Sequence, residues 1–294
     1  MRVFVTGATG FIGSAIVKEL IGLGHQVLGL ARSDAGAQAV TAAGAEVHRG
    51  DLEDLASLRS GAAAADAVIH TAFIHDFSKF KQNCEIDRLA IETMGEVLAG
   101  SNKLLIVTAG TAVAKSDPNA AATEDDPPLS SKIAHRASEE AAGAVAAKGV
   151  RVAVVRLPQV HDTSKQGLVS YAIQVAREKG VVAYIGDGLN RWSAVHRLDA
   201  AHLFCLALEK GEGNVRYHAV AEEGVSAREI AETIGHGLHL PVVSITAEEA
   251  PAYFGWLAPF AGWDLSALSA KTRAQLGWEP TGPTLITDLK NMRY

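Results

Sequence analysis

Short apolar runs alternate, through the first half of the chain, with stretches in which apolar residues recur every three or four positions. Runs rich in Val, Ile and Leu are typical of strands that are buried on both faces of a sheet. The longer recurrence is typical of helices that bury one face. The runs predict strands at residues 3–6, 26–31, 46–49, 67–70, 103–108 and 152–157. The recurrences predict helices at residues 11–23, 35–43, 55–62, 84–100 and 132–148.

The second half of the chain is less regular. Helices are predicted at residues 167–179 and 198–209. Ser226 and Glu229 form a capping box, which opens a further helix that reaches residue 234. The segment 114–131 carries prolines and acids, so we expect a surface loop over the carboxyl ends of the strands.

Regular alternation of strands and helices predicts an α/β fold with a doubly wound parallel sheet. Residues 1–160 are expected to form this domain. Residues 161–294 are expected to form a smaller, mainly helical substrate lobe, from which some segments return to the main sheet. Ligands of such folds bind at the carboxyl ends of the strands, so substrate would lie between the two parts.

A glycine-rich turn follows the first apolar run, in the sequence VFVTGATGFIG at residues 3–13. One glycine allows a tight turn, another lets backbone N–H groups approach a pyrophosphate, and the third lets the helix pack on the strand. The phosphates would lie at the positive end of that helix. The alternative is a tight turn that binds nothing. We expect a dinucleotide-binding Rossmann domain whose turn contacts the cofactor through Gly7, Thr9, Gly10, Phe11, Ile12 and Gly13.

The residues after the second strand favour NADP (NADPH) over NAD. An acid near this point usually binds the adenosine ribose of NAD. Here Arg32 and Ser33 come first, and a guanidinium with a hydroxyl suits a 2′-phosphate. The alternative is that Arg32 is a solvated loop residue and Asp34 binds the ribose.

Other strand ends complete the predicted cofactor site. Asp51 and Leu52 follow the third strand, and Asp51 is placed either to contact the adenine amino group or to cap the next helix. Thr71 and Ala72 follow the fourth strand beside the cofactor. Small residues at that point also fit a tight turn.

The segments TGATGFIG, Gly50-Asp51-Leu52 and 107–113 (VTAGTAV) together resemble the short-chain dehydrogenase/reductase superfamily. The length and the second lobe resemble its extended or atypical branch, which includes sugar-nucleotide epimerases and dehydratases. The resemblance covers essentially the whole chain and implies NAD(P)-linked chemistry on a carbonyl or alcohol. It also implies cofactor contacts from Thr108 and from Pro158, beside which the nicotinamide passes.

The catalytic pattern of the superfamily, a tyrosine with a lysine four residues on, is absent because none of the five tyrosines has such a lysine. Aligned by Ser138, His135 takes the tyrosine position and Glu139 the lysine position. Asp87 aligns with the helical asparagine of the superfamily, and Thr111 lies beside the position of its active-site hydroxyl.

These substitutes define the catalytic candidates. His135 is the candidate proton donor, because an imidazole titrates near neutral pH. Glu139, one helical turn away, would raise the proton affinity of that imidazole. The alternative is that His135 and Glu139 form an ion pair on the surface. Thr111 would orient the substrate oxygen, or cap a turn. Asp87 would act in the proton relay, or be a plain acid on a helix surface.

Further residues are expected to face the substrate. His75 and His161 follow strands and are alternative acids in place of the tyrosine, while no compact ligand pair predicts a metal. Arg191 and Trp192 would line the substrate pocket, or Trp192 would anchor the two lobes. Residues Arg197 and Asp199 are expected to form a structural pair at a helix start.

Composition narrows the function classes. A net charge of −6 and a pI near 6.0 give no reason to expect binding to nucleic acid or to an anionic membrane. No apolar run suits a membrane span or a signal peptide. Two cysteines, Cys84 and Cys205, are expected in the core, and a reducing, cytoplasmic location fits. The Ala-rich helix after the fifth strand would allow a homodimer.

The sequence therefore predicts an NADP-dependent oxidoreductase that transfers hydride between the nicotinamide and a small ketone, aldehyde or alcohol. The aromatic, mostly uncharged stretch 253–263 favours an apolar substrate. A nucleotide-sugar epimerase or dehydratase would need more basic residues for the diphosphate. A regulatory protein that senses NADP without catalysis is the alternative from another class.

Overall fold

The computed structural model describes residues 1–113, 120–128 and 137–294. A seven-stranded sheet, in the order β10-β6-β5-β4-β1-β2-β3, forms the larger body, and its pairs are parallel. The predicted doubly wound α/β fold is confirmed. The strands are β1 Arg2–Thr6, β2 Gln26–Ala31, β3 Glu46–Arg49, β4 Ala67–His70, β5 Leu104–Gly110, β6 Arg151–Leu157 and β10 Val215–His218.

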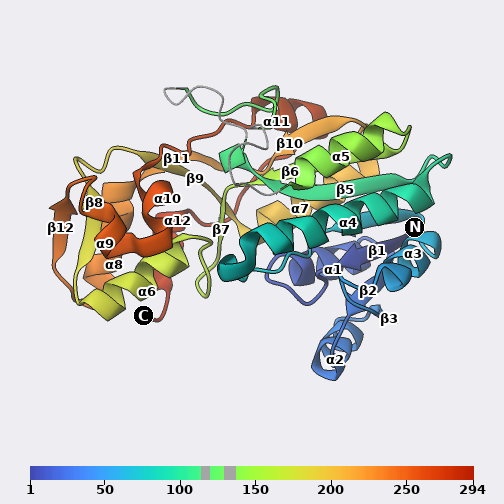
Figure 1. The fold of residues 1–294 in the computed structure, drawn as a ribbon, viewed down its shortest axis with the longest axis horizontal. Coiled ribbons are helices and arrows are strands. Elements are labelled where there is room, and N and C mark those ends of the chain that lie inside the picture. The colour runs from blue at the N-terminus through green and yellow to red at the C-terminus, as the bar shows by residue number, and fades with distance from the viewer. Residues whose placement is uncertain (114–119, 129–136) are drawn as a thin grey trace.

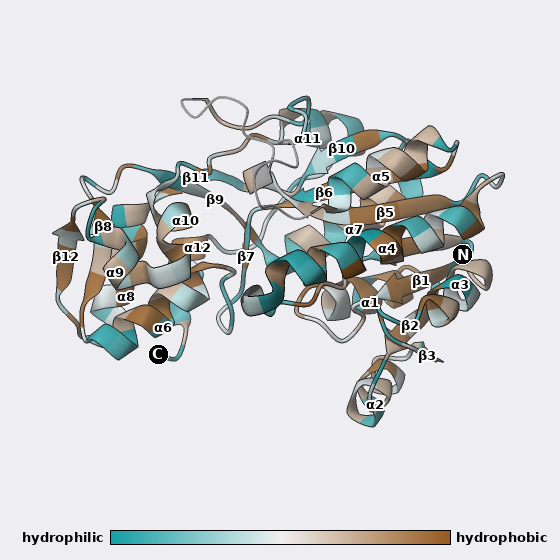
Figure 2. Ribbon diagram, in the orientation of Figure 1, coloured by the Kyte–Doolittle hydropathy of each residue, from teal (hydrophilic) through white to brown (hydrophobic). Residues whose placement is uncertain are grey.

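Helices cover both faces of this sheet (Figure 1). One buried cluster joins the sheet to α1 and α7, and a second joins it to α3, α4 and α5. Figure 2 shows the central strands as apolar and helices such as α4 as alternately polar and apolar. The helices of this body are α1 Gly13–Gly22, α2 Asp34–Ala42, α3 Leu55–Ala63, α4 Phe80–Leu98, α5 Ser138–Ala147, α7 Arg197–Lys210 and α11 Ala270–Leu276, with the 3-10 turns η1 Phe77–Lys79 and η2 Thr111–Val113.

A smaller body lies beside the carboxyl ends of the strands (Figure 1). Its strands form a three-stranded sheet, β11-β9-β7, and a two-stranded sheet, β12-β8. The strands are β7 Gln159–His161, β8 Val182–Ile185, β9 Arg191–His196, β11 Glu222–Ser226 and β12 Val242–Ile245. The helices are α6 Val169–Lys179, α8 Ala227–Leu238, α9 Ala250–Phe254, η3 Gly255–Leu257, α10 Ala258–Gly262 and α12 Leu285–Asn291.

Residues after 160 contribute to both bodies. Strand β10 extends the main sheet beside β6, and α7 packs on α1. Ser226 caps the helix as predicted, since its hydroxyl accepts the Glu229 N–H at 3.2 Å. The helix that it opens continues to Leu238, beyond the predicted end at residue 234.

The acidic, proline-containing segment differs from its prediction. Residues 114–119 and 129–131 lie outside the described residues, but Ala122 and Glu124 are buried rather than at the surface. The Glu124 carboxylate accepts the backbone N–H and the hydroxyl of Thr272, both at 2.9 Å. The position of the Glu124 carboxylate against the first turn of α11 is stabilising, because the N–H groups at the start of a helix carry partial positive charge. The segment therefore packs against the C-terminal half of the chain.

Candidate functional site

The turn between β1 and α1 requires glycine at its ends. Gly7 has a φ of +70°, and a Cβ on Gly7 would lie 2.8 Å from the backbone nitrogen of Ala72. A Cβ on Gly13 would lie 2.0 Å from the carbonyl oxygen of Gly7. The Gly10 N–H donates to that same carbonyl at 2.8 Å. The turn is therefore closed around its own backbone, which leaves its outer face for a ligand.

A cavity of about 920 Å³ lies over this turn at the carboxyl ends of the strands. Its walls come from the ends of β1, β2, β3, β4, β5 and β6 and from the segment before α6. The residues predicted to bind the cofactor that line it are Gly7, Thr9, Gly10, Phe11, Ile12, Gly13, Arg32, Ser33, Asp51, Leu52, Thr71, Ala72 and Pro158.

Near the end of β2, the cavity is lined by the exposed guanidinium group of Arg32. The Arg32 side chain is 76% exposed, and its Nη1 lies 4.0 Å from Asp51 Oδ2. Ser33 caps α2, because its hydroxyl accepts the Gly36 N–H at 3.1 Å. Asp34 forms an ion pair with Arg49 and does not line the cavity. The two candidate ribose contacts thus differ in position, since Arg32 lines the cavity and Asp34 does not.

A buried polar chain lies beneath the cavity and includes two predicted site residues. His70 Nδ1 lies 2.8 Å from the Thr6 hydroxyl, and His70 Nε2 lies 3.0 Å from Asp87 Oδ1. The Ser138 hydroxyl, at the start of α5, donates to Asp87. Thr108 donates to the His70 carbonyl at 2.8 Å and does not line the cavity. Asp87 is therefore a buried acid that links α4 to β4 and α5, not a helix-surface acid.

The other catalytic candidates have different surroundings. Thr111 is buried in η2, directly after β5, and is not among the residues that line the cavity. His75 lines the cavity after β4. His135 lies outside the described residues, so its proton-donating role stays a prediction.

Glu139, which the sequence paired with His135, accepts hydrogen bonds from two arginines. Arg156 Nε and Nη2 donate to its two oxygens at 2.6 and 2.8 Å, and Arg216 Nε donates at 3.2 Å. The side chains of Arg156 and Glu139 are 0% and 4% exposed. Two guanidinium groups neutralise the carboxylate, which argues against its raising the proton affinity of an imidazole. Sequence reasoning missed Arg156, which lies on another element.

The remaining substrate candidates lie away from the cavity. His161 is fully buried, and its Nδ1 is 2.7 Å from Asp288 Oδ2 in α12. Arg191 pairs with Asp264 at 3.1 Å. Trp192 is buried in the core of the smaller body and donates to the Phe260 carbonyl at 3.2 Å. We therefore do not retain these residues in the proposed substrate site.

The expected pair between Arg197 and Asp199 does not form, because side chains two residues apart on a helix do not face each other. Asp199 accepts the N–H groups of Thr281 and Gly282 at 3.1 and 2.8 Å. Arg197 instead contacts Asp162 at 3.2 Å. Lys165, near that contact, lines the cavity and was not predicted from the sequence.

Comparison with protein families matches residues 3–220 to the NAD dependent epimerase/dehydratase family. The chain belongs to this family. The family is part of the extended short-chain dehydrogenase/reductase superfamily, so the predicted resemblance is confirmed. Its members are NAD(P)-dependent oxidoreductases, epimerases and dehydratases, and this member is an enzyme of that type.

Several curated proteins are similar to this family member. An uncharacterized protein of Schizosaccharomyces pombe is 48% identical over 295 residues, which cover 100% of both chains. An uncharacterized protein of Saccharomyces cerevisiae is 45% identical and covers 99% of this chain and 98% of its own. A decarboxylating sterol-4-alpha-carboxylate 3-dehydrogenase of Dictyostelium discoideum is 27% identical, over 77% of this chain and 73% of its own.

Solved structures share the fold at low identity. A Thermus thermophilus UDP-glucose 4-epimerase in complex with NAD has a TM-score of 0.75 and 20% identity, and covers 99% of this chain and 97% of its own. A dTDP-glucose 4,6-dehydratase of Streptomyces venezuelae with bound NAD has a TM-score of 0.77 and 21% identity, and covers 99% and 95%. These similarities show the fold alone.

The described residues fit the dinucleotide that the family binds. The closed glycine turn places the N-terminus of α1 at the cavity wall, and the exposed Arg32 side chain lines the cavity near the end of β2. Within the described ranges, no three acidic, histidine or cysteine side chains gather in a way that would hold a metal ion. No described helix is long and apolar enough to cross a lipid bilayer.

Proposed function

We propose that this enzyme is an NADPH-dependent oxidoreductase that reduces an apolar ketone or aldehyde, or oxidises the corresponding alcohol. The bound dinucleotide would supply or accept the hydride. The chain supplies the cavity that holds the carbonyl against the nicotinamide and excludes water.

The observation that carries the proposal is the character of the cavity wall beyond the glycine turn. Its residues there are mostly apolar: Phe73, Ile74, Ala109, Leu157, Pro158 and Val160. Among the described wall residues, the cationic side chains are Arg32, at the adenosine end, and Lys165, beside the turn. A nucleotide-sugar diphosphate favours several basic contacts, whereas an apolar carbonyl favours this wall.

Aromatic side chains extend the apolar character around the cavity. The Phe73 ring meets the His75 ring edge-on at 5.3 Å and the Phe80 ring at 6.3 Å. Three curated relatives have names that include a sterol, a farnesyl-bearing ketone or an alkyl oxoalkanoate. Two are 26–27% identical over 77–87% of this chain, and the third is 40% identical over 24% of it. They are the sterol dehydrogenase above, a farnesyl-dihydroquinoline-oxide ketoreductase and a 2-alkyl-3-oxoalkanoate reductase. These names support the substrate class and do not establish it.

The preference for NADPH rests on Arg32, which lines the cavity, and on Asp34, which does not. We propose that His135 donates the proton. Thr111 lies directly after β5 but does not line the cavity, so we do not retain it as the residue that orients the substrate oxygen. His75, which lines the cavity, is the alternative proton donor.

Steady-state oxidation of NADPH with a panel of aliphatic and aromatic ketones and aldehydes tests the activity, with NADH in parallel. Turnover with NADPH supports the proposal. Heat stabilisation by UDP-sugars, with no turnover of any carbonyl, would replace it with epimerase or dehydratase chemistry.

The cofactor preference has its own test in Arg32→Ala. Loss of a charge-assisted contact to the 2′-phosphate should raise the Kd of NADPH by roughly 10- to 150-fold and leave that of NADH little changed. Arg49→Ala removes the same charge from the same sheet edge, at a residue that does not line the cavity, and is the matched control. Equal losses for both cofactors in Arg32→Ala would remove this residue from the 2′-phosphate site.

A further inference from the structure

Lys165 presents an ammonium group to the cavity beside the glycine turn. It lies in the short connection between β7 and α6 and lines the cavity together with Phe11 and Gly10. Its Nζ is 5.7 Å from the centroid of the Phe11 ring. Among the described residues, no carboxylate forms an ion pair with this ammonium. The charge is therefore available to a ligand.

The backbone of Lys165 is held in place by Asp162. One carboxylate oxygen of Asp162 accepts the N–H groups of Ser164 and Lys165 at 2.7 and 3.1 Å. Burial raises the pKa of Asp162, but hydrogen bonds from Ser164, Lys165 and Arg197 outweigh it and lower the pKa below its ordinary value of 3.8. The carboxylate is thus ionised across the neutral range and fixes the turn that carries the lysine.

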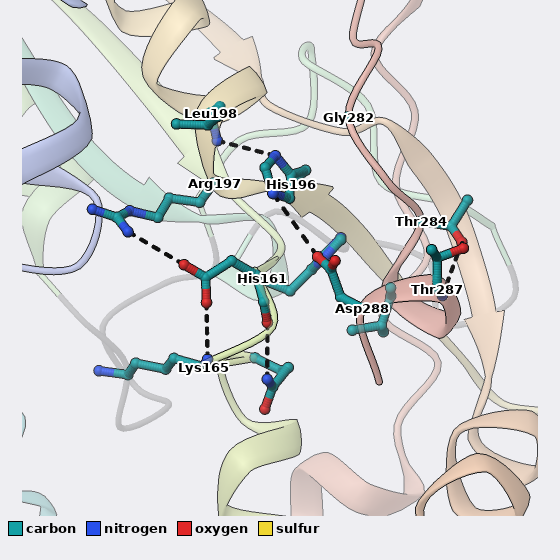
Figure 3. A network of polar contacts seen from close by, with 12 residues as sticks. His161, Lys165, His196, Arg197, Leu198, Gly282, Thr284, Thr287 and Asp288 are labelled. Atoms are coloured by element: carbon teal, nitrogen blue, oxygen red, sulfur yellow. Dashed lines mark hydrogen bonds and ion pairs between the residues drawn. The ribbon is translucent and has the colours of Figure 1, made fainter. Parts of the chain in front are cut away.

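Arg197 ties this turn to the dinucleotide-binding helix. Its Nη1 donates to the other Asp162 oxygen at 3.2 Å, and its Nη2 donates to the Ser14 hydroxyl in α1 at 2.7 Å. The guanidinium lies 4.9 Å from the Phe11 ring centroid. Figure 3 shows the Arg197 and Lys165 side chains extending in the same direction. Arg197 thus connects α1 to the turn that carries Lys165.

The turn is also anchored on its far side, in the smaller body. His161, next to Asp162, is fully buried and bonded to Asp288 of α12 (Figure 3). The Gln166 side-chain amide donates to the Asp162 carbonyl at 2.9 Å. Anchors on both sides limit the entropy that Lys165 would lose on binding a ligand, because its backbone is already ordered.

We propose that Lys165 binds the pyrophosphate of the dinucleotide, opposite the N–H groups of the glycine turn, and that Asp162 and Arg197 position it there. An anion at the N-terminus of α1 already meets the positive end of a helix. A lysine over the same turn adds a charge-assisted contact from the other side of the anion. The inference rests on the dinucleotide site of the proposed function, and not on the choice of substrate.

Binding titrations of Lys165→Met test the proposal without any need for turnover. The ligands are NADPH and NADH, followed by nicotinamide fluorescence, and ADP-ribose and adenosine 2′-monophosphate, followed by competition. ADP-ribose keeps the pyrophosphate and lacks the nicotinamide, whereas adenosine 2′-monophosphate lacks the pyrophosphate. Lys18→Met, an exposed lysine of α1 outside the cavity wall, is the matched control for lost charge.

We expect Lys165→Met to raise the Kd of NADPH, NADH and ADP-ribose by a common factor of about ten, and Lys165→Arg to keep most of the affinity. The loss should shrink at high ionic strength, because salt screens the contact. Adenosine 2′-monophosphate should bind the variant as it binds the parent, and Lys18→Met should bind all four ligands normally.

Three results would overturn the inference. The first is unchanged dinucleotide affinity in Lys165→Met. The second is an equal loss of affinity for adenosine 2′-monophosphate, which would indicate a long-range electrostatic effect of the lysine charge rather than a contact with the pyrophosphate. The third is a loss confined to the KM of an acidic substrate, which would assign the lysine to a substrate carboxylate. Absence of carbonyl turnover would refute the proposed function and leave this inference standing, since its first two tests are binding measurements.

Discussion

The buried pair of Glu139 and Arg156 predicts a large and specific effect on stability. Glu139→Gln keeps the shape of the side chain and removes its charge, which leaves the fully buried Arg156 guanidinium beside a neutral amide. Breaking a buried pair by removing one partner costs about 3–5 kcal/mol. Arg156 keeps the carbonyl oxygens of Asp126 and Thr123 as acceptors, at 2.8 and 3.3 Å. We therefore expect the lower end, about 3 kcal/mol, or a Tm lowered by roughly 6–12 °C.

Calorimetry and urea unfolding measure this effect, with Glu232→Gln as the control. Glu232 pairs with Arg228 at 3.5 Å with both side chains more than half exposed, so the same substitution should cost at most about 1 kcal/mol there. Replacing both partners, Glu139→Leu with Arg156→Met, should recover part of the loss seen in either single variant. A Glu139→Gln variant that melts no lower than Glu232→Gln would refute the argument from burial.

Two further predictions concern the turn and a buried histidine. Gly13→Ala places a Cβ 2.0 Å from the Gly7 carbonyl oxygen, so the turn must shift and the Kd of NADPH, measured by fluorescence titration, should rise at least about tenfold. His218 has its pKa lowered from 6.5, first by burial and then by Arg156. The unfolded chain therefore binds a proton that the folded chain rejects, and stability should fall below about pH 6.5 by up to about 1.4 kcal/mol per pH unit. Melting curves from pH 5 to 8 would check this slope, and His218→Gln should flatten it.

Strands β1, β2, β4, β5 and β6 are predictable because each is a short, largely apolar run. Strands β2, β3 and β4 begin and end at the predicted residues. The glycine turn is predictable for a related reason, since its geometry depends on residues within one segment. The cavity then follows from topology, because parallel strands deliver their carboxyl ends to one edge.

The contacts that the sequence could not predict join residues far apart in the chain. Arg197 reaches Ser14 across 183 positions, and His161 reaches Asp288 across 127. Periodicity and spacing carry no information about such pairs. The position of Lys165 at the cavity was not predicted for this reason, since the sequence between β7 and α6 has only the pattern of an ordinary polar turn.

The same limit explains why the arginine partners of Glu139 were not predicted. By alignment this residue marks a lost lysine, and helical spacing alone would pair it with His135. The structure shows that Glu139 joins α5 to β6 and β10 through Arg156 and Arg216. A lysine restored there would place an ammonium against two guanidinium groups, so Glu139→Lys should destabilise the fold more than Glu139→Gln does. Whichever residue donates the proton must therefore act without a cation at position 139, which favours a group that titrates near neutral pH unaided, such as an imidazole.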